Sequence, residues 1–130
     1  MKEKHILIVE DDTMMQALLK KIIGKEYRVT SRSNGLEALR WIQAGNMPDM
    51  IISDIKMPEM DGYELVRNIR NSGLYRNIPM LILSGEEDSA TRISFYKLHI
   101  NNFIVKPFNP DELLVLTKLI VGDLEMETGE

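Results

Sequence analysis

Short apolar runs alternate along the chain with longer segments in which apolar residues recur at helical spacing, and this alternation restricts the possible folds more than any other feature. Four runs are continuous and rich in β-branched residues, as is typical of strands buried on both faces of a sheet. These runs are His5–Val9, Met50–Ser53, Met80–Leu83 and Phe103–Val105. The segment Tyr27–Thr30 alternates apolar and polar residues, which predicts an edge strand.

Five segments with helical periodicity separate or follow these runs. Glycines predict the ends of the first two helices, near Gly24 and Gly45. The fourth shows only Ile93 and Tyr96 as apolar anchors. Strands that alternate with helices, without a hairpin signal, predict right-handed crossovers and a parallel sheet covered on both faces. The helices are expected over about 15–23, 36–42, 62–71, 88–98 and 111–120.

Length and composition narrow the class of protein. A length of 130 residues is typical of one domain. The composition, with 44% hydrophobic and 28% charged residues, is close to the average for soluble globular proteins. The absence of cysteine excludes disulfides, thiolate zinc sites and a cysteine nucleophile. A net charge of −4 disfavours electrostatic binding of the whole domain to nucleic acid or to an anionic membrane. The apolar run at Ile6–Val9 is too short for the core of a signal peptide. We therefore expect a cytoplasmic protein with protein partners.

Polar residues follow the ends of four predicted strands. Glu10–Asp12 follow the first strand, Asp54 the third, Ser84 the fourth and Lys106 the fifth. In parallel sheets, sites form beyond the carboxyl ends of the strands, so we expect these residues to gather at one edge. Carboxylates brought together repel one another unless a divalent cation lies among them. Oxygen ligands without His or Cys favour Mg²⁺, or Mn²⁺, over zinc.

Four blocks of the chain resemble the receiver domain of bacterial two-component response regulators, over about residues 4–121. The blocks are Ile6–Asp12, Asp54–Gly62, Pro79–Gly85 and Phe103–Phe108. The resemblance implies a doubly wound α/β fold, (βα)5, with five parallel strands in the flavodoxin-like order 2-1-3-4-5. It also implies a receiver domain over residues 1–122, followed by an acidic C-terminal tail over 123–130.

The same resemblance implies roles for single residues. Asp54 would accept a phosphoryl group, and Lys106 would pair with a phosphoryl oxygen. Mg²⁺ would bind Asp11 directly, Glu10 through water, Asp54 through its side chain and Lys56 through its backbone carbonyl. A carboxylate can attack phosphorus in this way when charge on the transferring group is neutralised.

Further positions match the switch of the family or depart from its pattern. Ser84 matches the hydroxyl that turns toward the phosphoryl group, and Phe103 matches the aromatic residue that moves inward. We expect Lys56 and Glu86 to pair beside the path of hydrolytic water and slow loss of the phosphoryl group; two unconnected surface charges are the alternative. His99–Ile100 stands where the family commonly has a Gly-Ala turn, which predicts an altered exit from the fourth helix.

The expected function is therefore phosphorylation-controlled signalling, without turnover of an external substrate. A sensor histidine kinase or a histidine phosphotransfer protein would donate the phosphoryl group, and the surface of the fourth helix, fifth strand and fifth helix would bind a downstream protein or an output domain outside this sequence. The alternatives are a degenerate receiver that acts as a constitutive scaffold, a phosphatase of the haloacid dehalogenase type and a flavin-binding module. The phosphatase needs Asp-x-Asp after the first strand, and the carboxylates of Glu10–Asp12 would repel a flavin phosphate.

Overall fold

The computed structural model describes residues 3–85 and 87–124, and within them five parallel strands form one sheet in the order β2-β1-β3-β4-β5. The strands are β1 (His5–Val9), β2 (Arg28–Arg32), β3 (Met50–Asp54), β4 (Met80–Ser84) and β5 (Phe103–Val105). The helices are α1 (Thr13–Ile23), α2 (Gly35–Gln43), α3 (Gly62–Arg70), α4 (Ser89–Tyr96) and α5 (Pro110–Val121). The predicted fold class and strand order are confirmed.

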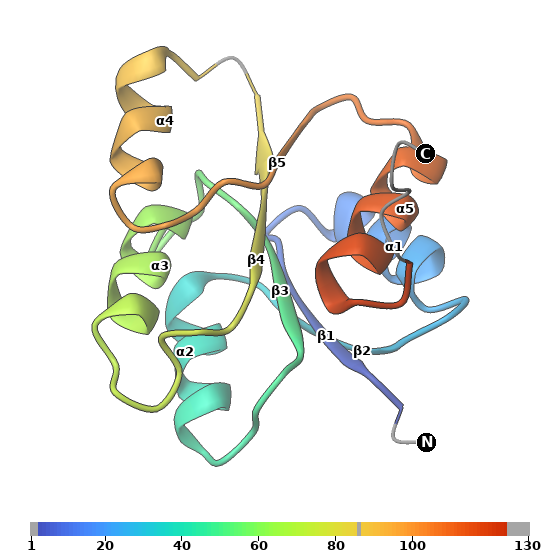
Figure 1. Cartoon of the computed structure of the whole chain (residues 1–130), viewed down its shortest axis with the longest axis horizontal. Helices are drawn as coiled ribbons and strands as arrows, with labels where there is room; N and C mark the ends of the chain where they lie inside the picture. The colour runs from blue at the N-terminus through green and yellow to red at the C-terminus, as the bar shows by residue number, and fades with distance from the viewer. Residues whose placement is uncertain (1–2, 86, 125–130) are drawn as a thin grey trace, which may run out of the picture.

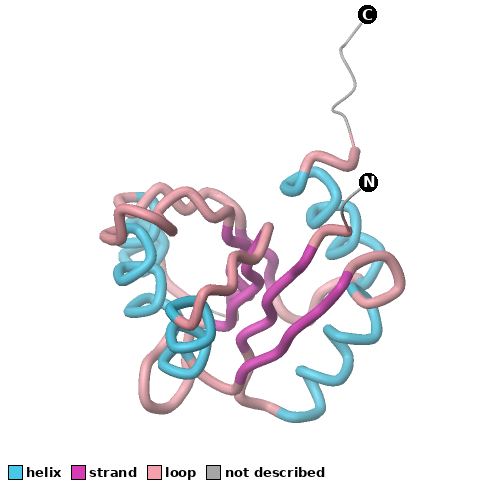
Figure 2. Tube along the Cα trace, turned by 90° about the horizontal axis from the view of Figure 1, so that it is seen from below, coloured by secondary structure: helices cyan, strands magenta, loops and turns pink. Residues whose placement is uncertain are grey.

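Helices cover both faces of the sheet. α1 and α5 lie on one face and α2, α3 and α4 on the other (Figure 1), and Figure 2 shows the strands between these layers. Side chains of the central strands alternate between the layers, as strands buried on both faces require. In β1, Ile6 and Ile8 pack in the α1 and α5 layer, whereas Leu7 and Val9 pack in the α2 and α3 layer.

The two sheet edges differ in how well the sequence predicts them. β2 is an edge strand, as its alternating pattern indicates. β5 forms the other edge, and Val105 is 60% exposed. The prediction that the run Phe103–Val105 is buried on both faces is therefore wrong. A three-residue run has too few positions for its pattern to distinguish a central strand from an edge.

The buried face of α4 also differs from the prediction. Ile93 and Tyr96 are 49% and 48% exposed, whereas Phe95 is completely buried. Phe95 packs edge-to-face against Tyr63 of α3 and Phe103 of β5, with ring centroids 5.5 and 5.9 Å apart. In a helix of eight residues more than one apolar stripe is possible, and the aromatic neighbours select the stripe that contains Phe95.

The chain leaves α4 through a Schellman motif that has His99 at its left-handed position. His99 has φ 61°, its N–H donates to the carbonyl of Tyr96 at 2.9 Å, and the N–H of Ile100 donates to the carbonyl of Phe95 at 3.1 Å. Ile100 is buried in the same core cluster as Phe95, which supplies the apolar contact usual in this motif. The prediction of an altered helix exit is therefore wrong. Burial of Ile100 holds His99 in a conformation that glycine adopts without strain.

Replacement of His99 by Gly is expected to raise the free energy of unfolding by about 0.5–1 kcal/mol, because Gly removes the left-handed strain. Equilibrium urea denaturation measures this change. The control is Lys97→Gly two residues earlier, where φ is −63° and Gly should destabilise the turn by about 0.5–1 kcal/mol. Equal effects of the two substitutions would contradict the assignment of strain to His99.

Candidate functional site

The carboxyl ends of β1 and β3 bring two acidic residues to the same edge of the sheet. In the parallel pairing of these strands Val9 lies opposite Ser53, so the next residues, Glu10 and Asp54, leave the sheet side by side. One oxygen each of Glu10, Asp11 and Asp54 lies within 4.8 Å of the others. The structure thus brings together the three carboxylates that the sequence predicts at a metal site.

Glu10 is the buried member of this cluster, with 1% of its surface exposed. Its Oε2 accepts a hydrogen bond from the backbone N–H of Asp12 at 3.1 Å, while its Oε1 is buried with no donor among the described residues. Burial raises the pKa of Glu10 to about 7, and the negative charge of Asp54 raises this pKa as well, against the opposing hydrogen bond from Asp12. A buried acceptor without a donor, in a set of oxygen ligands only, fits a hard divalent cation.

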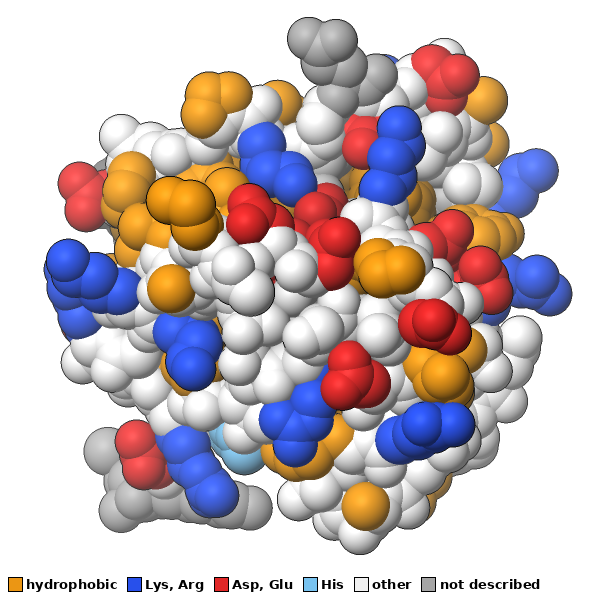
Figure 3. Space-filling view, turned by 180° about the vertical axis from the view of Figure 1, so that it is seen from behind, with side chains coloured by type: hydrophobic (Ala, Val, Ile, Leu, Met, Phe, Trp, Pro, Cys, Tyr) orange, Lys and Arg blue, Asp and Glu red, His pale blue; other side chains and the backbone are white. Residues whose placement is uncertain are grey.

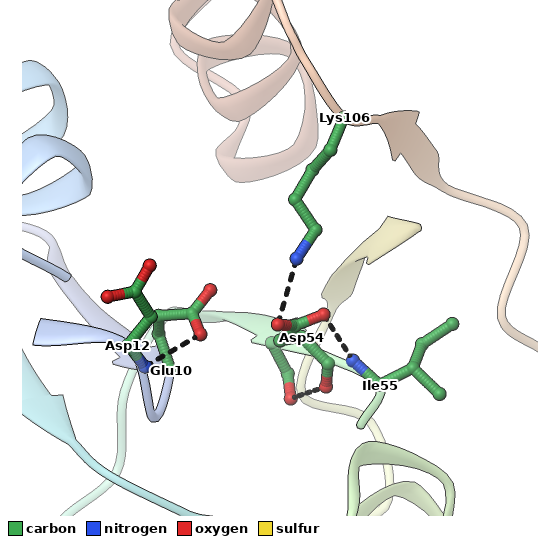
Figure 4. A network of polar contacts seen from close by, with 6 residues as sticks. Glu10, Asp12, Asp54, Ile55 and Lys106 are labelled. Atoms are coloured by element: carbon green, nitrogen blue, oxygen red, sulfur yellow. Dashed lines mark hydrogen bonds and ion pairs between the residues drawn. The ribbon is translucent and has the colours of Figure 1, made fainter. Parts of the chain in front are cut away.

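Asp54 is half-buried, and both of its carboxylate oxygens have partners (Figure 4). Lys106 Nζ lies 2.9 Å from Oδ2, and the backbone N–H of Ile55 donates to Oδ1 at 2.8 Å. Burial by itself lowers the pKa of Lys106, but the hydrogen bond and charge of Asp54 outweigh burial and raise this pKa overall. Lys106 thus supplies positive charge next to the acidic cluster.

The backbone around Lys106 fixes it in front of Asp54. The N–H of Lys106 donates to the carbonyl of Ser84 at 2.7 Å, and the peptide bond between Lys106 and Pro107 is cis. Because strands β4 and β5 pair in parallel, the ends of both strands meet beside the carboxylates. Lys106 therefore reaches Asp54 across the sheet edge from the end of β5.

Ser84 and Phe103 lie on adjacent strands with their side chains toward the same layer. In the strand register, Phe103 lies opposite Ile82 and Val105 lies opposite Ser84. Side chains two residues apart in a strand point to the same face of the sheet, so Ser84 and Phe103 both point toward the layer of α3 and α4. Ser84 is buried and Phe103 is half-buried, with its ring 5.7 Å from that of Tyr96. The two predicted switch residues therefore lie on the same face of the sheet, on adjacent strands.

The loop between β3 and α3 directly follows Asp54. Gly62 begins α3, its N–H donates to the carbonyl of Ile55 at 2.7 Å, and Asp61 caps the helix by accepting from the N–H of Glu64 at 2.9 Å. Lys56 is exposed in this loop. Glu86 lies outside the described residues, so its expected pairing with Lys56 stays a prediction.

Sequence reasoning assigned no role to Asp12 and Gln16, which support Glu10. Asp12 caps α1 by accepting from the N–H of Met14 at 3.1 Å, and its own N–H holds the Glu10 carboxylate. Gln16 Nε2 donates to the backbone carbonyl of Glu10 at 2.9 Å. An Asp immediately before an apolar helical pattern is the signal that could have identified the cap.

A sequence model of the response regulator receiver domain matches residues 6–118. The chain belongs to this family. The receiver domain of two-component systems pairs with histidine kinases and binds Mg²⁺ at an acidic pocket, and residues Glu10, Asp11 and Asp54 form such a cluster here. The match therefore favours a receiver over the phosphatase and flavin-binding alternatives.

Three relatives illustrate the family. The chain is 39% identical over 116 residues to the uncharacterized transcriptional regulatory protein YbdJ of Bacillus subtilis (88% of this chain, 49% of that protein). It is 31% identical over 119 residues to chemotaxis protein CheY1 of Helicobacter pylori (90% of this chain, 96% of that protein). The receiver domain of sensor histidine kinase PA1611 from Pseudomonas aeruginosa, with a magnesium ion in its active site cleft, superposes with a TM-score of 0.83 at 28% identity (93% of this chain, 99% of that chain).

The length of the receiver differs from that of several relatives. The chain spans less than two thirds of three curated relatives that it matches: YbdJ, a hybrid histidine kinase of Dictyostelium discoideum and a probable transcriptional regulator of Pyropia yezoensis. In the part of the chain that the structure describes, no helix is long and apolar enough to cross a bilayer.

Replacement of Asp11 by Asn is expected to stabilise the metal-free domain by about 1 kcal/mol, because it removes one of three repelling carboxylates. Free Mg²⁺ at ten times its Kd should stabilise the wild type by about 1.4 kcal/mol, and Asp11→Asn should lose most of this gain. Thermal unfolding with Mg²⁺ or EDTA measures both effects. Asp111→Asn, on the exposed first turn of α5, should keep the gain; an equal Mg²⁺ gain in Asp11→Asn would remove Asp11 from the metal site.

Proposed function

We propose that this receiver accepts a phosphoryl group on Asp54 from a sensor histidine kinase or a histidine phosphotransfer protein, in a reaction that depends on Mg²⁺. One observation carries the proposal: a half-buried carboxylate, Asp54, lies both within the Glu10 and Asp11 cluster and 2.9 Å from Lys106 Nζ. A single carboxylate that faces acidic ligands on one side and an ammonium group on the other can attack a phosphoryl group whose charge is neutralised from both sides.

The chemistry of the proposed transfer involves one bond formed and one broken. A carboxylate oxygen of Asp54 attacks phosphorus, the new O–P bond forms as the N–P bond of the phosphohistidine donor breaks, and the leaving imidazole nitrogen takes up a proton. When bound, Mg²⁺ would neutralise charge on the phosphoryl oxygens. Its direct ligands would be the side chains of Asp11 and Asp54 and the backbone carbonyl of Lys56, and Glu10 would bind it through water. Lys106 would give up its ion pair with Asp54 and pair with a phosphoryl oxygen at the same edge of the sheet.

The proposed response to phosphorylation is a change in packing between β4 and β5. The Ser84 hydroxyl would turn toward the phosphoryl group, and Phe103 would move into the space that it leaves. Phe103 already contacts the rings of Phe95 and Tyr96 in α4, so its movement would reach the outer surface of that helix. Exposed apolar side chains on α4, β5 and α5 offer a partner surface. These side chains are Ile93, Tyr96, Val105, Val115 and Leu119.

The proposed partner of this surface is a protein, or an output domain outside the sequence. The net charge of −4 disfavours nucleic acid as the partner, and on the face drawn in Figure 3 the acidic side chains gather near the centre while the described basic side chains are separated by other residues. We assign residues 1–122 to the receiver. In the proposed tail, Asp123 accepts from Tyr27 Oη at 2.7 Å and pairs with Lys4 Nζ at 3.0 Å, while residues 125–130 lie outside the described part.

Intact-mass spectrometry after incubation with Mg²⁺ and acetyl phosphate tests the proposal. Wild type is expected to gain about 80 Da, the mass of one phosphoryl group. Asp54→Asn should gain nothing, whereas Asp111→Asn, which makes the same chemical change on an exposed helix turn, should be modified like wild type. Absence of an adduct in the wild type would favour the constitutive scaffold. An adduct that persists in Asp54→Asn would place the acceptor elsewhere.

A further inference from the structure

Two buried side-chain oxygens lack a hydrogen-bond donor among the described residues, Glu10 Oε1 and Glu87 Oε2. The proposed metal site accounts for Glu10. Glu87 belongs to the loop between β4 and α4, and its carboxylate folds back over Gly85, where an added Cβ would lie 3.7 and 3.8 Å from the two oxygens. A buried carboxylate oxygen without a donor is costly, so it indicates a donor from outside the described residues.

Glu87 lines a cavity of about 380 Å³ between the β3–α3 loop and α4, a volume within the range of ligand sites. Tyr63 is the accessible aromatic side chain of the lining, and the completely buried Phe95 packs edge-to-face behind it. Two carboxylates, Glu87 and Asp61, and one ammonium group, Lys56, lie in the lining, so its formal charge is negative. Negative charge beside aromatic rings favours an organic cation over an anion or a neutral apolar ligand.

The hydroxyl groups in the lining cannot serve Glu87 as donors in this arrangement. Thr91 Oγ1 donates to Asp88 Oδ1 at 3.0 Å, and Ser94 Oγ donates to the carbonyl of Thr91 at 2.5 Å. Both hydroxyls therefore offer only lone pairs to other groups. A ligand in this cavity meets acceptors from Glu87, Thr91 and Ser94 besides the donor Lys56, so a ligand that donates hydrogen bonds finds more partners than one that only accepts them.

The two lysines nearest to Glu87 are also not its partners. Lys106 forms its ion pair with Asp54, and Lys56 lines the cavity without an ion pair to Glu87 within 4.0 Å among the described residues. Asp61, the second carboxylate, already accepts from the N–H of Glu64. Arg92 Nη1 donates to the backbone carbonyl of Glu87 at 2.8 Å, not to its carboxylate, so Glu87 Oε2 is left without a hydrogen-bond donor among the described residues.

We propose that this cavity binds a guanidinium or alkylammonium group, which donates to Glu87 and packs against Tyr63. Such a group bridges the loop that follows Asp54 to helix α4, two parts of the chain that meet at the cavity. A bound cation therefore stabilises one distance between this loop and α4. Binding does not require phosphorylation of Asp54, so it can be tested in the unmodified protein and can fail or succeed independently of phosphoryl acceptance.

Titration of ¹⁵N-labelled protein with ethylguanidinium chloride tests the proposal, with sodium chloride at equal ionic strength as the reference. Saturable amide shifts are expected at Thr91, Ser94 and Phe95, with a Kd in the millimolar range. Glu87→Gln should raise this Kd about tenfold, because it removes a charge-assisted hydrogen bond. Glu112→Gln, an equal charge change on exposed α5, should leave the Kd unchanged. Shifts equal to those in sodium chloride, or an unchanged Kd in Glu87→Gln, would overturn the proposal.

Two further arms identify the source of the cation and test the internal alternative. The peptide acetyl-Gly-Arg-Gly-amide should bind at least as tightly as ethylguanidinium if the group is a side chain of a partner protein, whereas exclusion of the peptide would indicate a free small molecule. Lys56→Met should bind ethylguanidinium about as well as wild type or better. Binding that appears only in Lys56→Met would show that Lys56 itself compensates Glu87, and this would overturn the proposal.

Discussion

Replacement of Lys106 by Met is expected to slow phosphorylation of Asp54 by about 100-fold. Lys106 Nζ lies 2.9 Å from Asp54 Oδ2, and its ammonium group is the positive charge that can follow the phosphoryl oxygens as they arrive. Loss of one such preorganised group costs about 10²–10³ in rate in comparable sites. Met keeps the length of the side chain and removes the charge, so the effect reports electrostatics more than packing.

The time course of the acetyl phosphate adduct, followed by intact mass at saturating Mg²⁺, measures this effect. Lys25→Met, in the exposed turn after α1, is the matched control and should keep the wild-type rate. A rate for Lys106→Met within about twofold of wild type would contradict the assigned role, because a charge-assisted contact is worth more than that.

Replacement of Gly62 by Ala is expected to lower the free energy of unfolding by about 3 kcal/mol or more. An added Cβ would lie 2.2 Å from the backbone carbonyl oxygen of Asp54 and 3.0 Å from Cα of Ile55. Both neighbours are backbone atoms, which cannot move away as the end of a flexible side chain can. The substitution is therefore expected to force α3 away from the end of β3 and to displace Asp54.

Chemical denaturation of Gly62→Ala and Gly73→Ala separates steric conflict from the intrinsic effect of alanine. An added Cβ at Gly73 meets no atom within 4 Å. Gly73→Ala should therefore leave stability unchanged or raise it by up to about 1 kcal/mol. If both variants lost the same stability, close approach of Gly62 to Asp54 would not be the reason that glycine stands there.

The acidic cluster illustrates a conflict between stability and function. Glu10 is buried, one of its oxygens has no donor in the part of the chain that the structure describes, and the charge of Asp54 opposes its ionisation. A domain selected only for stability would replace one of these carboxylates. Their retention at one sheet edge is understandable if a divalent cation and a phosphoryl group use them in turn, as in the proposed function.

The candidate site could be predicted from the sequence because the functional residues of a parallel sheet lie beyond the carboxyl ends of its strands. Once Glu10, Asp54 and Lys106 are placed after β1, β3 and β5, topology alone brings them together. The spacing of these residues along the sequence does not give the distances between them in space, but the regular pairing of strands limits where each side chain can lie. The motif blocks around them then indicated the receiver family, which the match over residues 6–118 shows.

The helix α4 and its exit were predicted poorly for a physical reason. The buried residue Phe95 is selected by rings that arrive from α3 and β5, far away along the chain. The left-handed conformation of His99 follows from burial of Ile100 rather than from any preference of His. Local patterns report preferences of a segment, and these two features depend on partners outside the segment.

The sequence by itself determined the alternation of strands and helices, the edge position of β2 and the gathering of carboxylates at one end of the sheet, because periodicity and parallel pairing act on every residue of a strand. Only the tertiary structure decided which face of α4 is buried, why glycine is needed at Gly62 and that Oε2 of the half-buried Glu87 lies beside a cavity with no hydrogen-bond donor among the described residues. Those features arise where atoms from separate elements compete for the same space or the same hydrogen bond, and such competition is defined only when the elements are packed together.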